Sequence, residues 1–149
     1  MTRIERDLDL QEYIARYYNP LPVSEACRAC PRHAATWACP PFAFDAPSLL
    51  SRYTRIRLIA CTFTVSESPD FDTIAPIRRR LNTSLLELED RLQGHAFYFG
   101  GSCTLCPRCT RPQGQPCRHP LKMRPSLEAF GFDLIATLAD HFNITLSWS

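Results

Sequence analysis

TRIRLIACTFTV, residues 54–65, is the stretch that decides the fold. It is rich in β-branched residues, and Ile56, Leu58 and Ala60 alternate with residues of the opposite face, which predicts a strand. The middle of the segment is apolar on both faces, which is typical of a central strand.

The next segment, TIAPIRRRLNTSLLELEDRL at residues 73–92, predicts an amphipathic helix, because its apolar residues recur every three or four positions. We expect Asp72 or Thr73 to cap this helix and Pro76 to lie in its first turn. The polar face is expected to carry Arg78, Arg79, Glu87 and Asp90.

Weaker patterns surround these two elements. A capping box formed by Asp9 and Glu12 predicts a helix over residues 9–18, and Asp133 predicts a capped helix ending at Phe142. Short strands are expected at residues 96–99 and 144–148, and a helical turn at residues 124–131. Residues 20–47 have no clear period and predict an irregular loop that carries cysteines.

These patterns predict a single metal-binding domain over residues 1–149, of the α/β (α+β) class. We expect a small central sheet of about three or more strands, packed by helices, with two cysteine-rich metal loops at one edge.

The composition is that of a globular protein, with 45% hydrophobic residues and a net charge of +2. The N-terminal segment is charged from its third residue, and no apolar stretch has the length of a membrane span. We therefore expect a cytoplasmic protein with no membrane association. In a reducing compartment, clustered cysteines favour metal or redox chemistry over disulfides.

Seven of the eight cysteines form two motifs. The first is CRACPRHAATWAC at residues 27–39, and the second is CTLCPRCTRPQGQPC at residues 103–117. Thiolates at such spacings suit iron–sulfur clusters or zinc. The metal ligands predicted are Cys27, Cys30, Cys39, Cys103, Cys106, Cys109 and Cys117.

The triplet of Cys103, Cys106 and Cys109 has the spacing of [4Fe–4S] sites in bacterial-type ferredoxins. Its fourth ligand is Cys117 or Cys39, and the short loop to Cys117 favours the former. Zinc is the alternative metal, although zinc sites more often use two separated cysteine pairs.

The first motif has three cysteines and lacks a fourth ligand. It predicts a second cluster with one open iron, a site completed by Cys61 or His33, or a cluster shared between both motifs. The number of clusters is therefore one or two. Cys61 lies in the predicted strand, where a small buried apolar residue is the favoured interpretation.

Residues 100–127 contain no acidic residue but five of the 17 basic ones. Arg118, Lys122 and Arg124 are therefore candidates for binding an anion or for surrounding an anionic cluster. Glu128 and His119 are the candidates for proton transfer. Nucleic acid is disfavoured as a partner, because the basic stretch is short and the net charge is small.

The segments TWACPPF, GGSCTLCPRC and PCRHPLKMRPSLEAFGFD together resemble a family of predicted metal-binding proteins, domain of unknown function 2284. The resemblance runs from about Cys27 to the C-terminal helix. It implies metal binding, iron–sulfur in character, through the seven motif cysteines. The chain has His33-Ala34 where many members of that family have Tyr-Gly. The resemblance therefore does not define the conformation of the turn before Cys39.

The leading hypothesis is a [4Fe–4S] protein that serves redox chemistry or electron transfer with a protein partner. One alternative is an iron–sulfur enzyme that uses an open cluster iron for sulfur transfer or desulfidation of a small anionic substrate. The other is a zinc-stabilised interaction module without catalysis. The sequence does not decide whether the protein is an enzyme, nor its oligomeric state.

Overall fold

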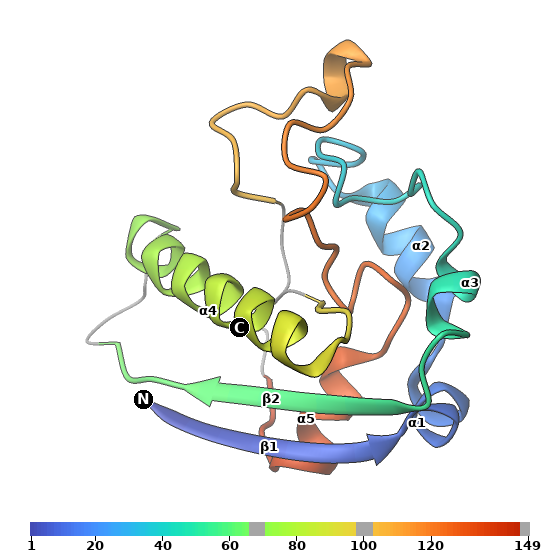
Figure 1. Ribbon diagram of the computed structural model, residues 1–149, viewed down its shortest axis with the longest axis vertical. Coiled ribbons are helices and arrows are strands. Elements are labelled where there is room, and N and C mark those ends of the chain that lie inside the picture. The colour runs from blue at the N-terminus through green and yellow to red at the C-terminus, as the bar shows by residue number, and fades with distance from the viewer. Residues whose placement is uncertain (66–70, 98–102, 147–149) are drawn as a thin grey trace.

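The computed structural model describes residues 1–65, 71–97 and 103–146 (Figure 1). Its two strands are β1 (Thr2–Asp9) and β2 (Arg55–Thr62), which pair antiparallel with Ile4 opposite Ala60 and Leu8 opposite Ile56. These apolar pairs lie on one face of the ribbon, because side chains alternate between faces along a strand.

The other face of the ribbon explains why a charged N-terminal segment forms a strand. Asp7 lies opposite Arg57, and the Arg57 guanidinium donates to both carboxylate oxygens of Asp7 at 2.7 and 3.1 Å. Opposite charges facing each other across a ladder stabilise strand pairing. Sequence analysis did not predict β1, because its charges mask the alternation of its apolar residues.

The predicted sheet of three or more strands is not confirmed. Within the described residues the sheet has two strands, and β2 pairs with β1 alone. Residues 96–97 and 144–146 are not in strands, while the rest of both predicted short strands, residues 98–99 and 147–148, lies outside the described part.

Three predicted helices are present. In α1 (Leu10–Tyr17) the Asp9 carboxylate accepts from the backbone N–H of Glu12 at 3.0 Å, and in α5 (Leu134–Phe142) Asp133 caps in the same way. The long helix α4 spans Phe71–Leu92. Because α4 begins at Phe71, the predicted caps at Asp72 and Thr73 are wrong, and Pro76 lies inside the helix, not in its first turn.

Two helices replace part of the predicted irregular loop. They are α2 (Pro20–Ala29) and α3 (Ala46–Leu50). A proline at the first helical position is compatible with helix formation, because its missing N–H would have no partner there. No residue of α2 is buried, so this helix needs no apolar period and gives no such signal in the sequence.

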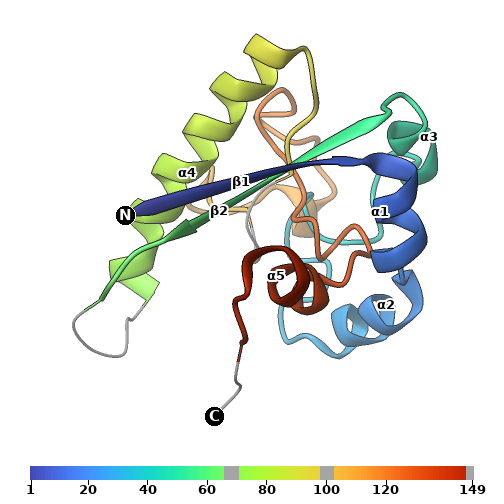
Figure 2. The ribbon, with the colours of Figure 1, turned by 90° about the horizontal axis from the view of Figure 1, so that it is seen from below.

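The core lies where α1, β2 and the segment before α5 meet. Its buried residues are Tyr13, Tyr17, Leu50, Leu58, Phe130 and Phe132. Phe132 is only 1% exposed and stacks on Tyr13 at 5.1 Å between ring centroids. Figure 2 shows α5 beside α1, and α4 apart from both. None of the described helices combines the length and the apolar character that crossing a membrane requires.

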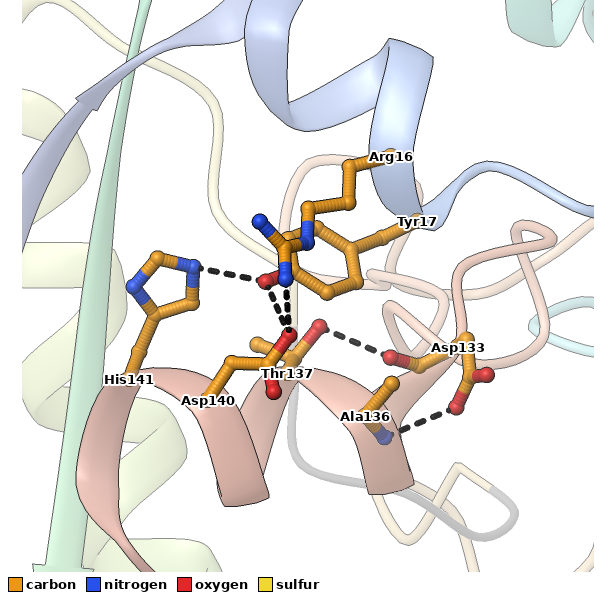
Figure 3. Close-up of polar contacts among 7 residues, drawn as sticks. All are labelled: Arg16, Tyr17, Asp133, Ala136, Thr137, Asp140 and His141. Carbon is orange, nitrogen blue, oxygen red and sulfur yellow. Dashed lines mark hydrogen bonds and ion pairs between the residues drawn. The ribbon is translucent and has the colours of Figure 1, made fainter.

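Polar contacts fasten α5 to α1 (Figure 3). The Tyr17 hydroxyl donates to Asp140 at 2.8 Å, and its oxygen lies 3.0 Å from Nε2 of His141. Arg16 adds an ion pair to Asp140 at 3.2 Å. Backbone bonds from Asn19 N–H to Gly131 and from Asp133 N–H to Tyr17 join the same two regions. The C-terminal quarter of the chain is therefore anchored on α1.

Tyr13 gives a test of this core. Burial raises the pKa of Tyr13 to about 12, although its hydrogen bond with Thr137 at 2.8 Å acts in the opposite direction. The fold therefore favours the neutral phenol, and that stabilisation is present below pH ~10 and lost as the pH rises through ~12. We expect Tyr13→Phe to cost about 1 kcal/mol at neutral pH, with the deficit shrinking above pH ~10.

Urea unfolding of both proteins across this pH range measures the effect. Tyr53→Phe, at a half-buried position outside the core cluster, is the matched control. A constant difference between wild type and Tyr13→Phe at all pH values would contradict the assignment.

Candidate metal centre

The four cysteines of the second motif surround one cavity. Its volume is about 20 Å³, and its lining includes Cys103, Cys106, Cys109, Cys117, Trp37, Arg118, His119 and Met123. The loop that carries these cysteines is irregular apart from a short 3-10 turn at Arg111–Gln113. The structure therefore brings together the predicted ligands of the second motif and places Trp37 of the first motif beside them.

Backbone N–H groups point at the sulfurs in a repeated pattern. The N–H of Arg32 donates to Cys30 Sγ and that of His119 to Cys117 Sγ, both at 3.4 Å. The N–H of Leu105 likewise donates to Cys103 and lowers the pKa of its thiol. Each donor is two residues after its cysteine, so these turns are shaped to stabilise negative charge on sulfur.

The Cys103 thiol is influenced by the charges of the other three cysteines of the second motif. Burial raises the pKa of its thiol, and the nearby thiolates of Cys109, Cys117 and Cys106 raise it further. Arg78 of α4 is near enough to Cys103 for a thiolate charge there to raise the pKa of Arg78. Burial lowers the pKa of Arg78, whose guanidinium is half-buried, although the prediction placed Arg78 on the solvent face of its helix. Arg78 is therefore less exposed than the predicted polar face of the helix requires.

Arg111 and Trp37 join the two cysteine loops. The Arg111 guanidinium donates to the backbone carbonyls of Thr36 at 2.8 Å and Pro41 at 2.9 Å, and also to that of Cys39. It also lies 5.2 Å from the Trp37 ring centroid, and the indole N–H donates to the Gln115 carbonyl at 3.1 Å. Figure 1 shows the two loops side by side at one end of the molecule. The two cysteine-rich loops are thus in contact with each other, and their binding of metal stays a prediction.

Glu89 of α4 binds the residues on either side of the loop that carries the second cysteine motif, Ala96 and Arg124. Its carboxylate pairs with the Arg124 guanidinium at 2.6 and 2.9 Å and accepts from the Ala96 N–H. The two side chains of this pair are only 17% and 12% exposed. Burial alone would raise the pKa of Glu89, but the bonds from Arg124 and Ala96 hold it below its ordinary value. One carboxylate therefore holds the residues on both sides of the cysteine loop.

The first motif begins on the last turn of α2. Cys27 lies in that helix, Cys30 is its C-terminal cap, and Cys39 follows an irregular turn. Burial raises the pKa of the Cys27 thiol, and the charges of Cys39, Glu128 and Cys30 raise it further. The hydroxyl of Thr36, a residue only 4% exposed, lies 3.3 Å from Cys39 Sγ.

The turn between these cysteines contains Ala34 with a φ of +51°. This left-handed conformation favours glycine, because a Cβ is crowded there. The conformation is kept in this chain at some cost.

The remaining candidates have different positions. Arg118 and His119 line the cavity, and both are exposed, as is Lys122. Arg118 also donates to the carbonyl of Arg108 at 2.8 Å. Arg124 binds Glu89, and Glu128 is exposed on the turn before α5. Cys61 is half-buried on β2 opposite Arg3, apart from the core cluster, so its placement in the core is wrong.

Sequence reasoning missed Arg78, Glu89 and Arg111 as neighbours of the site. Arg78 and Glu89 are on a helix whose charges alternate with apolar residues, which is the pattern of an ordinary solvent face. Arg111 differs in no way from the other basic residues of its loop. Within the described part of the chain, no three His, Cys, Asp or Glu side chains are drawn together tightly enough to hold one ion.

Comparison with known proteins gives one match. A family model described as predicted metal-binding protein, domain of unknown function 2284, matches residues 21–149. No curated protein and no solved structure matches the chain. The matched range contains all seven motif cysteines together with Glu89, Arg111 and Arg124.

Removal of the Glu89 carboxylate tests its role at the base of the loop. Glu89→Gln leaves Arg124 largely buried without its counter-charge, and we expect a loss of about 2–4 kcal/mol of unfolding free energy. The pKa of Glu89 is depressed, so the wild-type advantage should be present above pH ~4.5 and fall as the carboxylate is protonated. Asp7→Asn in the exposed pair with Arg57 is the control, and it should cost much less because solvent screens that pair. Equal losses in the two variants, measured by denaturant unfolding, would contradict this role.

Ala34→Gly should stabilise the metal-free protein by roughly 0.5–1 kcal/mol, because relief of the left-handed strain exceeds the added backbone entropy of glycine. Thermal unfolding measures the change. Ala35→Gly, at a neighbouring position without positive φ, should destabilise by a similar amount. Destabilisation by Ala34→Gly would show that the turn is not strained.

Proposed function

The chain belongs to the family of predicted metal-binding proteins of domain of unknown function 2284, and on that premise we propose that it is an iron–sulfur protein. Cys103, Cys106, Cys109 and Cys117 hold a [4Fe–4S] cluster, and the protein exchanges electrons with a redox partner. The observation that carries this proposal is the convergence of four cysteines on one cavity, with N–H donors aimed at Cys103 and Cys117.

The donor set fits such a cluster. Four thiolates at the triplet spacing plus one remote cysteine are the ligands of a cubane cluster. The N–H donors to sulfur reduce the basicity of the thiolates, and hydrogen bonds of this kind raise the reduction potential of a cluster. When bound, the cluster supplies reversible one-electron transfer.

The surrounding residues have defined tasks in this proposal. Trp37 and Met123 line the cavity with apolar surface and exclude water. Arg78 from α4 and Arg118 from the loop place positive charge near the sulfurs. Cations beside an anionic cluster stabilise its reduced form, which carries one more negative charge.

The exposed loop offers a face for an acidic partner. Arg108, Arg118 and Lys122 are exposed on it, and residues 103–127 carry no carboxylate side chain. Leu121, 86% exposed, lies among them. A basic rim around an exposed apolar side chain suits a transient redox complex, in which complementary charges steer association. A small anionic substrate would meet the same charges.

Anaerobic purification followed by iron, sulfide and EPR analysis tests the proposal. Wild-type protein should be brown, and Cys106→Ser should lose most of its cluster iron and sulfide. Cys61→Ser is the matched control, because Cys61 lies on β2 and does not line the cavity. Colourless protein with stoichiometric zinc would overturn the iron–sulfur assignment and favour a zinc-stabilised interaction module.

A further inference from the structure

One part of the first cysteine loop is packed against the rest of the molecule, and it begins at Thr36. Thr36 and Ala38 are only 4% and 5% exposed, whereas residues 28–33 of the same loop are all exposed. Residues 36–41, here called the Trp37 segment, are therefore held by contacts with other parts of the chain. Those contacts show what the segment does for its surroundings.

Arg111 of the second loop binds the Trp37 segment at both ends and in the middle. Its guanidinium donates to the carbonyl of Thr36 at 2.8 Å, to that of Pro41 at 2.9 Å, and to that of Cys39 between them. A guanidinium presents several donors in one rigid plane, which the compact ammonium of a lysine cannot reproduce. The same guanidinium lies 5.2 Å from the centroid of the Trp37 ring. Arg111 therefore contacts both the backbone of the segment and its indole.

Trp37 in turn contacts the part of the second loop between Cys109 and Cys117. Its indole N–H lies 3.1 Å from the Gln115 carbonyl and 3.3 Å from the Thr110 hydroxyl. The ring lines the cavity that the four cysteines of the second motif surround. A side chain of the first motif thus forms part of the boundary of the site in the second motif.

Aromatic packing fixes the other end of the Trp37 segment to the core. Phe42, the next residue, lies 5.8 Å from Phe130 and 5.0 Å from Phe44 between ring centroids. Phe130 is only 3% exposed and belongs to the core cluster. The segment is therefore bound by the second loop along its length and by the core at its end, and a side chain on such a support is held in one place.

We propose that the Trp37 segment is the cover of the second motif's site, with Trp37 limiting the access of water and small solutes and Arg111 as the residue that positions Trp37. This inference rests on the proposed function, because it concerns the same site. The first motif acts here through its backbone and its indole, independently of any metal bound by its own cysteines. Since exposure to water stabilises the more negative, reduced form of a cluster, the cover should lower the reduction potential and slow the loss of iron.

Acrylamide quenching of Trp37 fluorescence in the reduced, metal-free, full-length protein tests the positioning by Arg111. The chain has two tryptophans, and Trp148→Phe leaves Trp37 as the sole indole. In that background Arg111→Lys keeps the positive charge but loses the planar set of donors, so the quenching constant should rise toward that of the urea-unfolded protein. Arg32→Lys, the same change at an exposed arginine of the first loop, is the matched control and should leave the constant unchanged.

Release of iron to EDTA from the anaerobically purified protein, followed as loss of cluster absorption, tests the cover itself. Trp37→Ala should speed the release by about tenfold or more, and Arg111→Lys by a similar factor. The double variant should release iron no faster than Trp37→Ala alone, because Arg111 acts through Trp37 and the two effects are then not additive. Trp37→Phe, which keeps a ring but loses the N–H, should lie between wild type and Trp37→Ala.

The reduction potential separates positioning from charge. In an EPR-monitored titration, both Trp37→Ala and Arg111→Lys should raise the potential, because water replaces the ring at the cavity. An effect of Arg111 through its charge alone would leave the potential of Arg111→Lys at the wild-type value. Far-UV circular dichroism of each variant shows that it is folded.

Three results would overturn the inference. They are unchanged acrylamide quenching in Arg111→Lys, iron release at the wild-type rate in Trp37→Ala, and additive effects in the double variant. If wild type contains iron and sulfide while any of these is found, the inference fails and the proposed function stands. If wild type contains zinc instead, the proposed function fails, and the rate at which EDTA removes zinc from the same variants decides whether Trp37 covers the site.

Discussion

The ion pair between Glu89 and Arg124 is the interaction on which the second cysteine loop depends. The loop leaves α4 through Ala96 and returns at Arg124, and Glu89 binds both residues. Fixing the two ends of a long loop lowers the entropy that its cysteines lose on converging. The pair is largely buried, so this role also makes it costly to break.

From this base the loop extends to the first motif and contacts it through Arg111 and Gln115. Arg78 of α4 contributes a positive charge near Cys103. Arg111 donates hydrogen bonds to three backbone carbonyls of the first motif, those of Thr36, Cys39 and Pro41. A guanidinium suits this position, because its fixed planar donors can satisfy several carbonyls at once. The two motifs, more than sixty residues apart in the chain, therefore form one structural unit.

Sequence patterns were most informative where a local rule had one physical cause. The caps at Asp9 and Asp133 and the apolar stripe of α4 depend on neighbours within one or two turns, and these helices were predicted correctly. β1 and α2 were not, because the charged residues of β1 mask its apolar alternation and α2 has no buried residue. The inward position of Arg78 and the pairing of Glu89 with Arg124 depend on contacts between segments distant in sequence, which no local pattern encodes.

By itself the sequence determined the chemistry that the chain can offer, since seven cysteines in two spaced motifs have few uses other than binding metal. It also determined the main helices and the strand β2. Only the tertiary structure decided which side chains accompany those cysteines. It engaged Arg124, predicted to bind an anion, in a largely buried pair with Glu89, and it placed Arg111 on the backbone of the first motif. The reason is that ligand spacing is a local property of the chain, whereas a neighbouring charge is set by packing between segments.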